Sequence, residues 1–493
     1  MKTRVPKTVH ILLAILLLFS TLTAGCSSAL SRQQAPLQTQ AGNLVETPAK
    51  APVEAPVEAT SQTPAKALAE GQATSGLNAG AQLKPVPGTA SQDGTSANSP
   101  AGTQSQEQIQ SLLKAFKGIT ETFGEEPETE RNFTWITSAQ VKTGVVQYCE
   151  KNGFGGFDRQ NVTEVAARSY ITRTDDDTRA VHKAQLENLK PGTEYIYRVG
   201  DNAGGFSPQG IFKTAGPGRE QFTFINITDT QGGSARDYAV WKNTLDKALG
   251  RFPDARFLVH TGDMVDVGQD ISQWDVFTKA AQPELLSLPV MPAVGNHEGI
   301  NKNGTNNDFK NFTDRFYLPE EQDTGAPAGT VYSVDYGNAH IAVMNTQCGA
   351  RNLQKQADWL REDMKKSDRK WKIVALHRGP YGATYDTADI RRVWAPVFDE
   401  AAVDLVLEGH DHNYVRSYPM KGNMAVQEGK GTVYMVGDTG GVKFYPAKKR
   451  SWQAVDMQPE IQMYIAVTVS DNKVVIDACD IEDTLRDSIT LSK

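Results

Sequence analysis

The stretch Arg256-Phe257-Leu258-Val259-His260-Thr261-Gly262-Asp263 indicates how this chain should fold. A short apolar run that stops at a glycine and an acidic residue is typical of a buried strand in an α/β sheet. Open sheets of this class place their functional groups just past the carboxyl ends of the strands. The segment therefore predicts an α/β domain with Asp263 in its site.

The same pattern recurs four more times along the chain. Phe222–Ile227 leads to Asp229, Val290–Val294 leads to Asn296 and His297, Trp371–Leu376 leads to His377, and Val403–Leu407 leads to His410 and His412. Between the strands, apolar residues repeat at helical spacing, as in Leu353, Ala357, Leu360 and Met364. We place this α/β domain at residues 220–493.

The polar residues at these five strand ends offer carboxylate oxygens, an amide oxygen and imidazole nitrogens. The set is Asp229, Asp263, Asn296, His377, His410 and His412. Such a mixture suits Mn, Fe or Zn better than Ca or Mg. One carboxylate can bridge two ions about 3.5–4 Å apart, and that arrangement activates water against phosphorus. The ordered set predicts a site for two divalent or trivalent metal ions.

The order of these motifs resembles the calcineurin-like metallophosphoesterases. Gly409–Ser417 and Tyr332–Gly337 are similar to the purple acid phosphatase branch of that superfamily. The resemblance implies a four-layer α+β sandwich that binds two ions. It assigns the first ion to Asp229, Asp263 and His412, and the second ion to Asp263, Asn296, His377 and His410, with Asp263 as the bridge.

The resemblance also implies an activity and two residues that carry it. A hydroxide shared by the two ions should hydrolyse phosphomonoesters, and His297 should stand beside the leaving group as general acid or transition-state donor. Purple acid phosphatases have a tyrosine ligand three residues after the bridging aspartate, where this chain has Asp266, so we expect no purple colour. Asp266 instead resembles the second aspartate of protein Ser/Thr phosphatases, and we expect its carboxylate to hydrogen-bond His297.

Three further polar residues near these motifs are open to interpretation. Gln231 stands where many relatives have His, and it either ligates the first metal or hydrogen-bonds a metal-bound water. Arg378 either holds a phosphate oxygen or is a solvated loop residue. Glu298 is expected to support a turn rather than bind metal.

The N-terminal region reads as an export signal and a tether. Lys2, Arg4 and Lys7 precede the apolar run 11–19, and small residues lead to Cys26, which predicts a signal peptide over residues 1–25. Leu22–Ser27 resembles a bacterial lipobox, so we expect a lipid on Cys26; ordinary cleavage near Ala24 and secretion is the alternative. No Phe, Tyr or Trp occurs between Phe19 and Phe116, which predicts a disordered tether over residues 26–115. The expected location is the outer face of the cell membrane.

Residues 120–215 read as a small β domain. Short alternating segments are separated by turn signals, and Pro191-Gly192 precedes the strand-like run from Thr193 to Val199. The pattern resembles the fibronectin type III sandwich, an immunoglobulin-like fold in which Tyr195 would be the tyrosine corner.

The net charge of the chain limits the classes of substrate, and two alternative functions remain. With 51 basic and 58 acidic side chains the net charge is −7, which argues against nucleic-acid polymers as partners and leaves a small phosphate ester as the expected substrate. The loop 299–330 is the candidate determinant of substrate specificity. A phosphodiesterase acting on nucleotides or envelope polymers is the first alternative, and a surface-binding lipoprotein with a vestigial metal site is the second. The sequence does not specify an oligomeric state.

Overall fold

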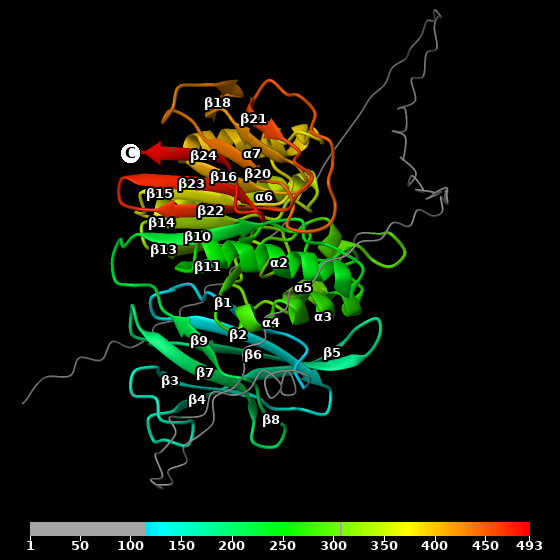
Figure 1. The fold of residues 1–493 in the computed structure, drawn as a ribbon, viewed down its shortest axis with the longest axis vertical. Coiled ribbons are helices and arrows are strands. Elements are labelled where there is room, and N and C mark those ends of the chain that lie inside the picture. Colours follow the sequence, from blue (N-terminus) through cyan, green and yellow to red (C-terminus); the bar gives the residue numbers. More distant parts are fainter. Residues whose placement is uncertain (1–114, 306–307) are drawn as a thin grey trace, which may run out of the picture. The chain divides into compact units, whose positions relative to one another are not determined.

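The computed structural model describes residues 115–305 and 308–493, coloured along the chain in Figure 1. The predicted signal peptide, Cys26 and nearly all of the predicted tether lie outside these residues. Within the described ranges, no helix has the length and apolar character needed to cross a membrane.

The first domain is all β and consists of two antiparallel sheets. One sheet has the order β1-β2-β6-β5, built from Ile119–Thr122, Arg131–Ser138, Thr178–Leu186 and Arg168–Arg173. The other has the order β4-β3-β7-β8 with β9 also paired to β7, built from Thr163–Ala166, Val145–Glu150, Glu194–Asp201, Gly205–Phe206 and Gly210–Lys213. The phenolic oxygen of Tyr195 accepts a hydrogen bond from the Lys190 amide at 2.8 Å, the bond predicted for a tyrosine corner.

The second domain contains two mixed sheets. The first has the order β12-β11-β10-β22-β23-β24, formed by Val290–Pro292, Ala255–His260, Phe222–Ile227, Met463–Val469, Lys473–Asp480 and Leu485–Ser492. The second has the order β13-β14-β15-β16-β20-β17-β21, formed by Tyr332–Tyr336, Ala339–Val343, Trp371–Ala375, Leu405–Glu408, Val433–Gly437, Tyr414–Ser417 and Gln453–Met457. A hairpin joins β18, Met420–Lys421, to β19, Met424–Ala425.

Helices cover the outer faces of the two sheets. The longer ones are α2 (Ala235–Arg251), α3 (Ile271–Ala280), α6 (Ala350–Lys366) and α7 (Ala388–Ala401). The short ones are α4 (Gln282–Leu285), the 3₁₀ turn η1 (His297–Gly299) and α5 (Lys310–Thr313). Figure 1 shows α2 running alongside β10 and β11.

Alternation along the strands explains the layers. In β15, Ile373 joins the core that includes the first sheet and α2, while Val374 joins the core that includes α6 and α7. Both faces of the strand are buried from Ile373 onward, so Ile373–Ala375 is a continuous apolar run. The order helix, sheet, sheet, helix confirms the predicted four-layer fold behind an all-β domain.

Polar contacts join the two domains beside the loop 299–305. Arg179 of β6 makes a bidentate pair with Asp275 of α3 at 2.6 and 2.8 Å, and Arg315 reaches the same carboxylate at 2.9 Å. Lys302 pairs with Asp175 of the β domain at 2.5 Å. The β domain therefore braces the segments that flank the strand ends.

Candidate metal centre

The predicted ligands meet because their strands end at a common edge. β10, β11 and β12 run parallel within one sheet, and β15 and β16 run parallel within the other. The backbone turns sharply after these strands: Asp229, Asp263, His410 and His412 have positive φ angles of 53°, 55°, 77° and 47°. Left-handed backbone is strained for such residues, and strain of this kind gathers at functional sites.

Two glycines allow these turns to approach one another. A Cβ on Gly262 would lie 2.7 Å from the amide nitrogen of Gly295 and 2.8 Å from His377 Nδ1. A Cβ on Gly409 would lie 2.1 Å from the Thr228 hydroxyl oxygen. The Gly-Asp and Gly-His pairs seen in the sequence are therefore packing requirements of the site.

The first group of donors is Asp229, Asp263 and His412, which offer one ligand atom each within 4.8 Å of one another and are buried. His412 Nε2 lies 3.2 Å from Asp229 Oδ1. The other ring nitrogen, Nδ1, donates to the carbonyl oxygen of Lys443 at 2.9 Å. Because that bond fixes the ring, Nε2 points toward the carboxylates as a ligand atom must.

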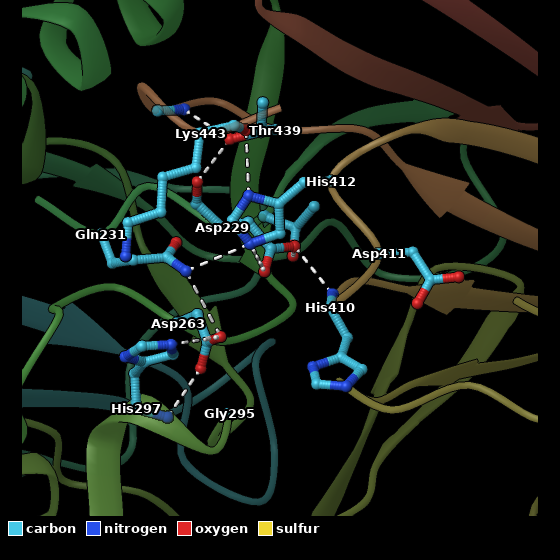
Figure 2. Close-up of polar contacts among 12 residues, drawn as sticks. Asp229, Gln231, Asp263, Gly295, His297, His410, Asp411, His412, Thr439 and Lys443 are labelled. Carbon is cyan, nitrogen blue, oxygen red and sulfur yellow. Dashed lines mark hydrogen bonds and ion pairs between the residues drawn. The ribbon is translucent and has the colours of Figure 1, made fainter. Parts of the chain in front are cut away.

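The second group is Asp263, His377 and His410, again within 4.8 Å. His377 Nε2 lies 3.1 Å from Asp263 Oδ2 and 3.1 Å from the amide oxygen of Asn296, while its Nδ1 donates to the Thr261 carbonyl at 2.9 Å. Asp263 belongs to both groups, as a bridging ligand would. With Asn296 beside His377, all six predicted metal residues come together in one site, and Figure 2 shows His410 and His412 beside Asp229 and Asp263.

Electrostatics fit a site built for cations. Burial would raise the pKa of Asp263, but the neighbouring His377 and His297 imidazoles hold it far below its ordinary value. Burial would lower the pKa of His377, but Asp263 raises it to about 9. Burial lowers the pKa of His410 to about 3, which keeps that ring neutral. Because a metal ligand must be a neutral imidazole, an ion that binds here displaces the proton of His377.

Glu298 supports Asp263, as predicted for a turn residue. One of its oxygens accepts from the amides of Gly295 at 2.6 Å and Asp263 at 2.8 Å, and the other accepts from Met264 at 2.7 Å. It therefore ties the turn that carries Asp263 to the turn that carries Asn296 and His297.

The structure corrects the predicted contact between Asp266 and His297. His297 Nδ1 donates to the main-chain carbonyl of Asp266 at 2.6 Å, while the Asp266 carboxylate lies 3.5 Å away and pairs with the ammonium group of Lys443. The carbonyl is fixed by the backbone, so it holds the ring, and the carboxylate is drawn to the stronger cationic partner. His297 Nε2 faces Asp263 Oδ2 at 3.8 Å.

Lys443 was missed in the sequence. It follows β20, an apolar strand parallel to β16, after the glycine-rich run Gly437-Asp438-Thr439-Gly440-Gly441 that begins at the end of the strand. An apolar strand followed by glycine and polar residues is the pattern that predicted the site at the other five strands. The same pattern at β20 would have pointed to Lys443.

Gln231 lies beside the first group of donors, whereas Arg378 faces Asp389. When the Gln231 amide nitrogen donates to the carbonyls of Asp229 at 3.1 Å and Asp263 at 3.2 Å, its oxygen faces His412 Nε2 at 3.1 Å, on the first group of donors. The guanidinium of Arg378 lies 3.7 Å from Asp389 and is 30% exposed, which fits the loop interpretation.

Comparisons with known proteins agree with this geometry. Residues 117–214 match the purple acid phosphatase N-terminal domain, and residues 222–414 match the calcineurin-like phosphoesterase domain. An uncharacterised Mycobacterium tuberculosis protein is 26% identical over 353 residues, covering 62% of this chain and 63% of its own length. Human acid phosphatase type 7 is 29% identical over 267 residues, covering 49% of this chain and 57% of its own length. The match therefore spans about three fifths of these relatives.

A solved structure shows the same fold. Purple acid phosphatase PPD1 from yellow lupin seeds aligns with a TM-score of 0.66 at 20% identity, covering 76% of this chain and 74% of that chain. The two domains, in this order and with this donor set, show that the chain belongs to the calcineurin-like metallophosphoesterases, in the branch of the purple acid phosphatases.

Proposed function

We propose that this protein hydrolyses phosphomonoesters with two metal ions held by Asp229, Asp263, Asn296, His377, His410 and His412. The observation that supports it most strongly is the convergence of two donor groups that share Asp263, with His297 beside them. Carboxylate and imidazole donors of this kind suit Fe, Mn or Zn. Two Arabidopsis relatives are named probable inactive purple acid phosphatases, so the test of this function measures the activity of this chain itself.

In hydrolysis, some of these residues would bind the ions, and His297 would protonate the leaving group. Two bound ions would lower the pKa of water and neutralise charge on the phosphoryl oxygens. His297 is held by the Asp266 carbonyl with its Nε2 toward Asp263, so it can donate a proton to the leaving oxygen as the P–O bond breaks. Asn296 and His297 are adjacent in the chain, so the residue that would bind metal also positions the acid.

Activity of the metal-loaded protein tests this function. The full chain with Cys26→Ser, loaded separately with Mn, Fe or Zn, is assayed on p-nitrophenyl phosphate and bis(p-nitrophenyl) phosphate. We expect turnover of the monoester and a loss of about 10²–10⁴-fold in kcat for His297→Ala with its ions retained. Asn296→Ala should reduce the metal content.

The alternatives predict other results. Hydrolysis of the diester alone would favour the phosphodiesterase, and two bound ions without turnover of either ester would favour a surface-binding lipoprotein. Either result would overturn the proposal.

We also propose export and lipid attachment at Cys26. The support is the charged start, the apolar run and the lipobox-like Leu22–Ser27. Palmitate labelling of cells that produce the wild-type chain, but not of cells that produce Cys26→Ser, is the expected result. Equal labelling would refute it.

A further inference from the structure

Lys443 stands on the rim of the metal centre. The side chains of His297, Asp266 and Lys443 are 21%, 34% and 31% exposed, whereas those of Asp229 and His412 are 0% and 1% exposed. The buried residues form the floor of the site, and these three polar side chains meet solvent beside it. Figure 2 shows Lys443, Gln231 and His297 on one side of the two aspartates and His410 on the other.

The backbone fixes where Lys443 can reach. Its carbonyl oxygen accepts from Nδ1 of His412 at 2.9 Å, so the residue is tied to a predicted metal ligand. Gly441, two residues before Lys443, lies against the chain at Asp229, because a Cβ there would be 2.7 Å from the Asp229 carbonyl oxygen. The loop is therefore held in place by the site.

The ammonium group has capacity for an anion. It carries three N–H donors, and it pairs with the Asp266 carboxylate, which can occupy only part of that capacity. That carboxylate is 3.5 Å from His297, and His297 is 3.8 Å from Asp263, so successive contacts lead from the ammonium to the shared ligand. Arg378, the other candidate cation, faces Asp389 instead.

We infer that Lys443 binds a non-bridging phosphoryl oxygen of the substrate and selects dianionic phosphomonoesters over phosphodiesters. A monoester carries one more charged oxygen than a diester, in which that oxygen is esterified. Two ions and a third cation match the charge of the monoester, whereas the third cation has no charged partner in a diester. This inference rests on the proposed function and names its substrate class.

The test compares two substrates with the same leaving group. For Lys443→Met with both ions bound, we expect kcat/KM to fall about 10- to 100-fold with p-nitrophenyl phosphate and less than about threefold with bis(p-nitrophenyl) phosphate. Lys443→Arg should restore most of the monoester activity because it keeps the charge. Titration calorimetry with inorganic phosphate should show about tenfold weaker binding to Lys443→Met.

Lys449→Met is the matched control, because Lys449 is in the same loop, is 83% exposed and pairs with Asp456. Its kinetics should equal those of the wild type. Equal losses on both substrates, or unchanged phosphate binding, would overturn the role of Lys443. An inactive wild type would refute the proposed function instead, and the phosphate titration would still decide whether Lys443 binds the anion.

Discussion

Asp266→Asn should reduce activity much less than His297→Ala, because a main-chain carbonyl, and not the Asp266 carboxylate, accepts the hydrogen bond that orients His297. The substitution leaves that 2.6 Å hydrogen bond in place and removes only a carboxylate 3.5 Å from Nδ1. At 3.5 Å a full charge is worth about 1–2 kcal/mol in a largely aqueous dielectric. The carboxylate is 34% exposed and already paired with Lys443, so its net effect on the ring should be below about 1 kcal/mol.

That bound corresponds to a loss of less than about fivefold in kcat, against about 10²–10⁴-fold for His297→Ala. Both variants would be assayed on p-nitrophenyl phosphate after their metal content and thermal unfolding have been matched to the wild type. Asp386→Asn is a suitable control, because Asp386 is an exposed carboxylate paired with Arg391. A loss for Asp266→Asn as large as that for His297→Ala would refute the reasoning and restore the carboxylate–imidazole dyad expected from the sequence.

Three further predictions test the surrounding structure. Burial would lower the pKa of His340, but hydrogen bonds to two carboxylates raise it, so its paired charge stabilises the fold below about pH 6.5 and this stabilisation is lost as pH rises through the folded pKa. The loss of unfolding free energy caused by His340→Gln, measured in urea, should therefore be larger at pH 5.5 than at pH 9. A loss that grows with pH would contradict this. Asp275→Asn should lower the free energy of unfolding by about 3 kcal/mol because it leaves the buried Arg315 without its carboxylate partner. The control Asp246→Asn, at an exposed helix pair, should lower it by less than about 0.5 kcal/mol. Similar unfolding midpoints for the two variants would refute the difference. Gln231→Ala should weaken one of the two metal sites in a chelator competition and leave the other unchanged, and equal affinities would place Gln231 outside the ligand set.

Much of the site could be predicted because its signal is local. Each predicted ligand follows an apolar strand directly, and parallel strands bring such residues to one edge whatever the details of packing. Three histidines outside the ligand set, His182, His260 and His340, each have a hydrogen-bond partner within the fold. The fold class follows from the same alternation of strands and helices.

What only the tertiary structure decided is which polar groups face one another. The sequence by itself determined that Asp266 is three residues from Asp263, but its carboxylate turns to Lys443, which is 177 residues away and reaches it through the loop after β20. Likewise, Glu298 supports Asp263 because two turns from different strands are packed close enough to share one carboxylate. Strand ends are specified by neighbouring residues along the chain, whereas the partners of loop side chains are specified by how the two sheets pack, and no local pattern records that.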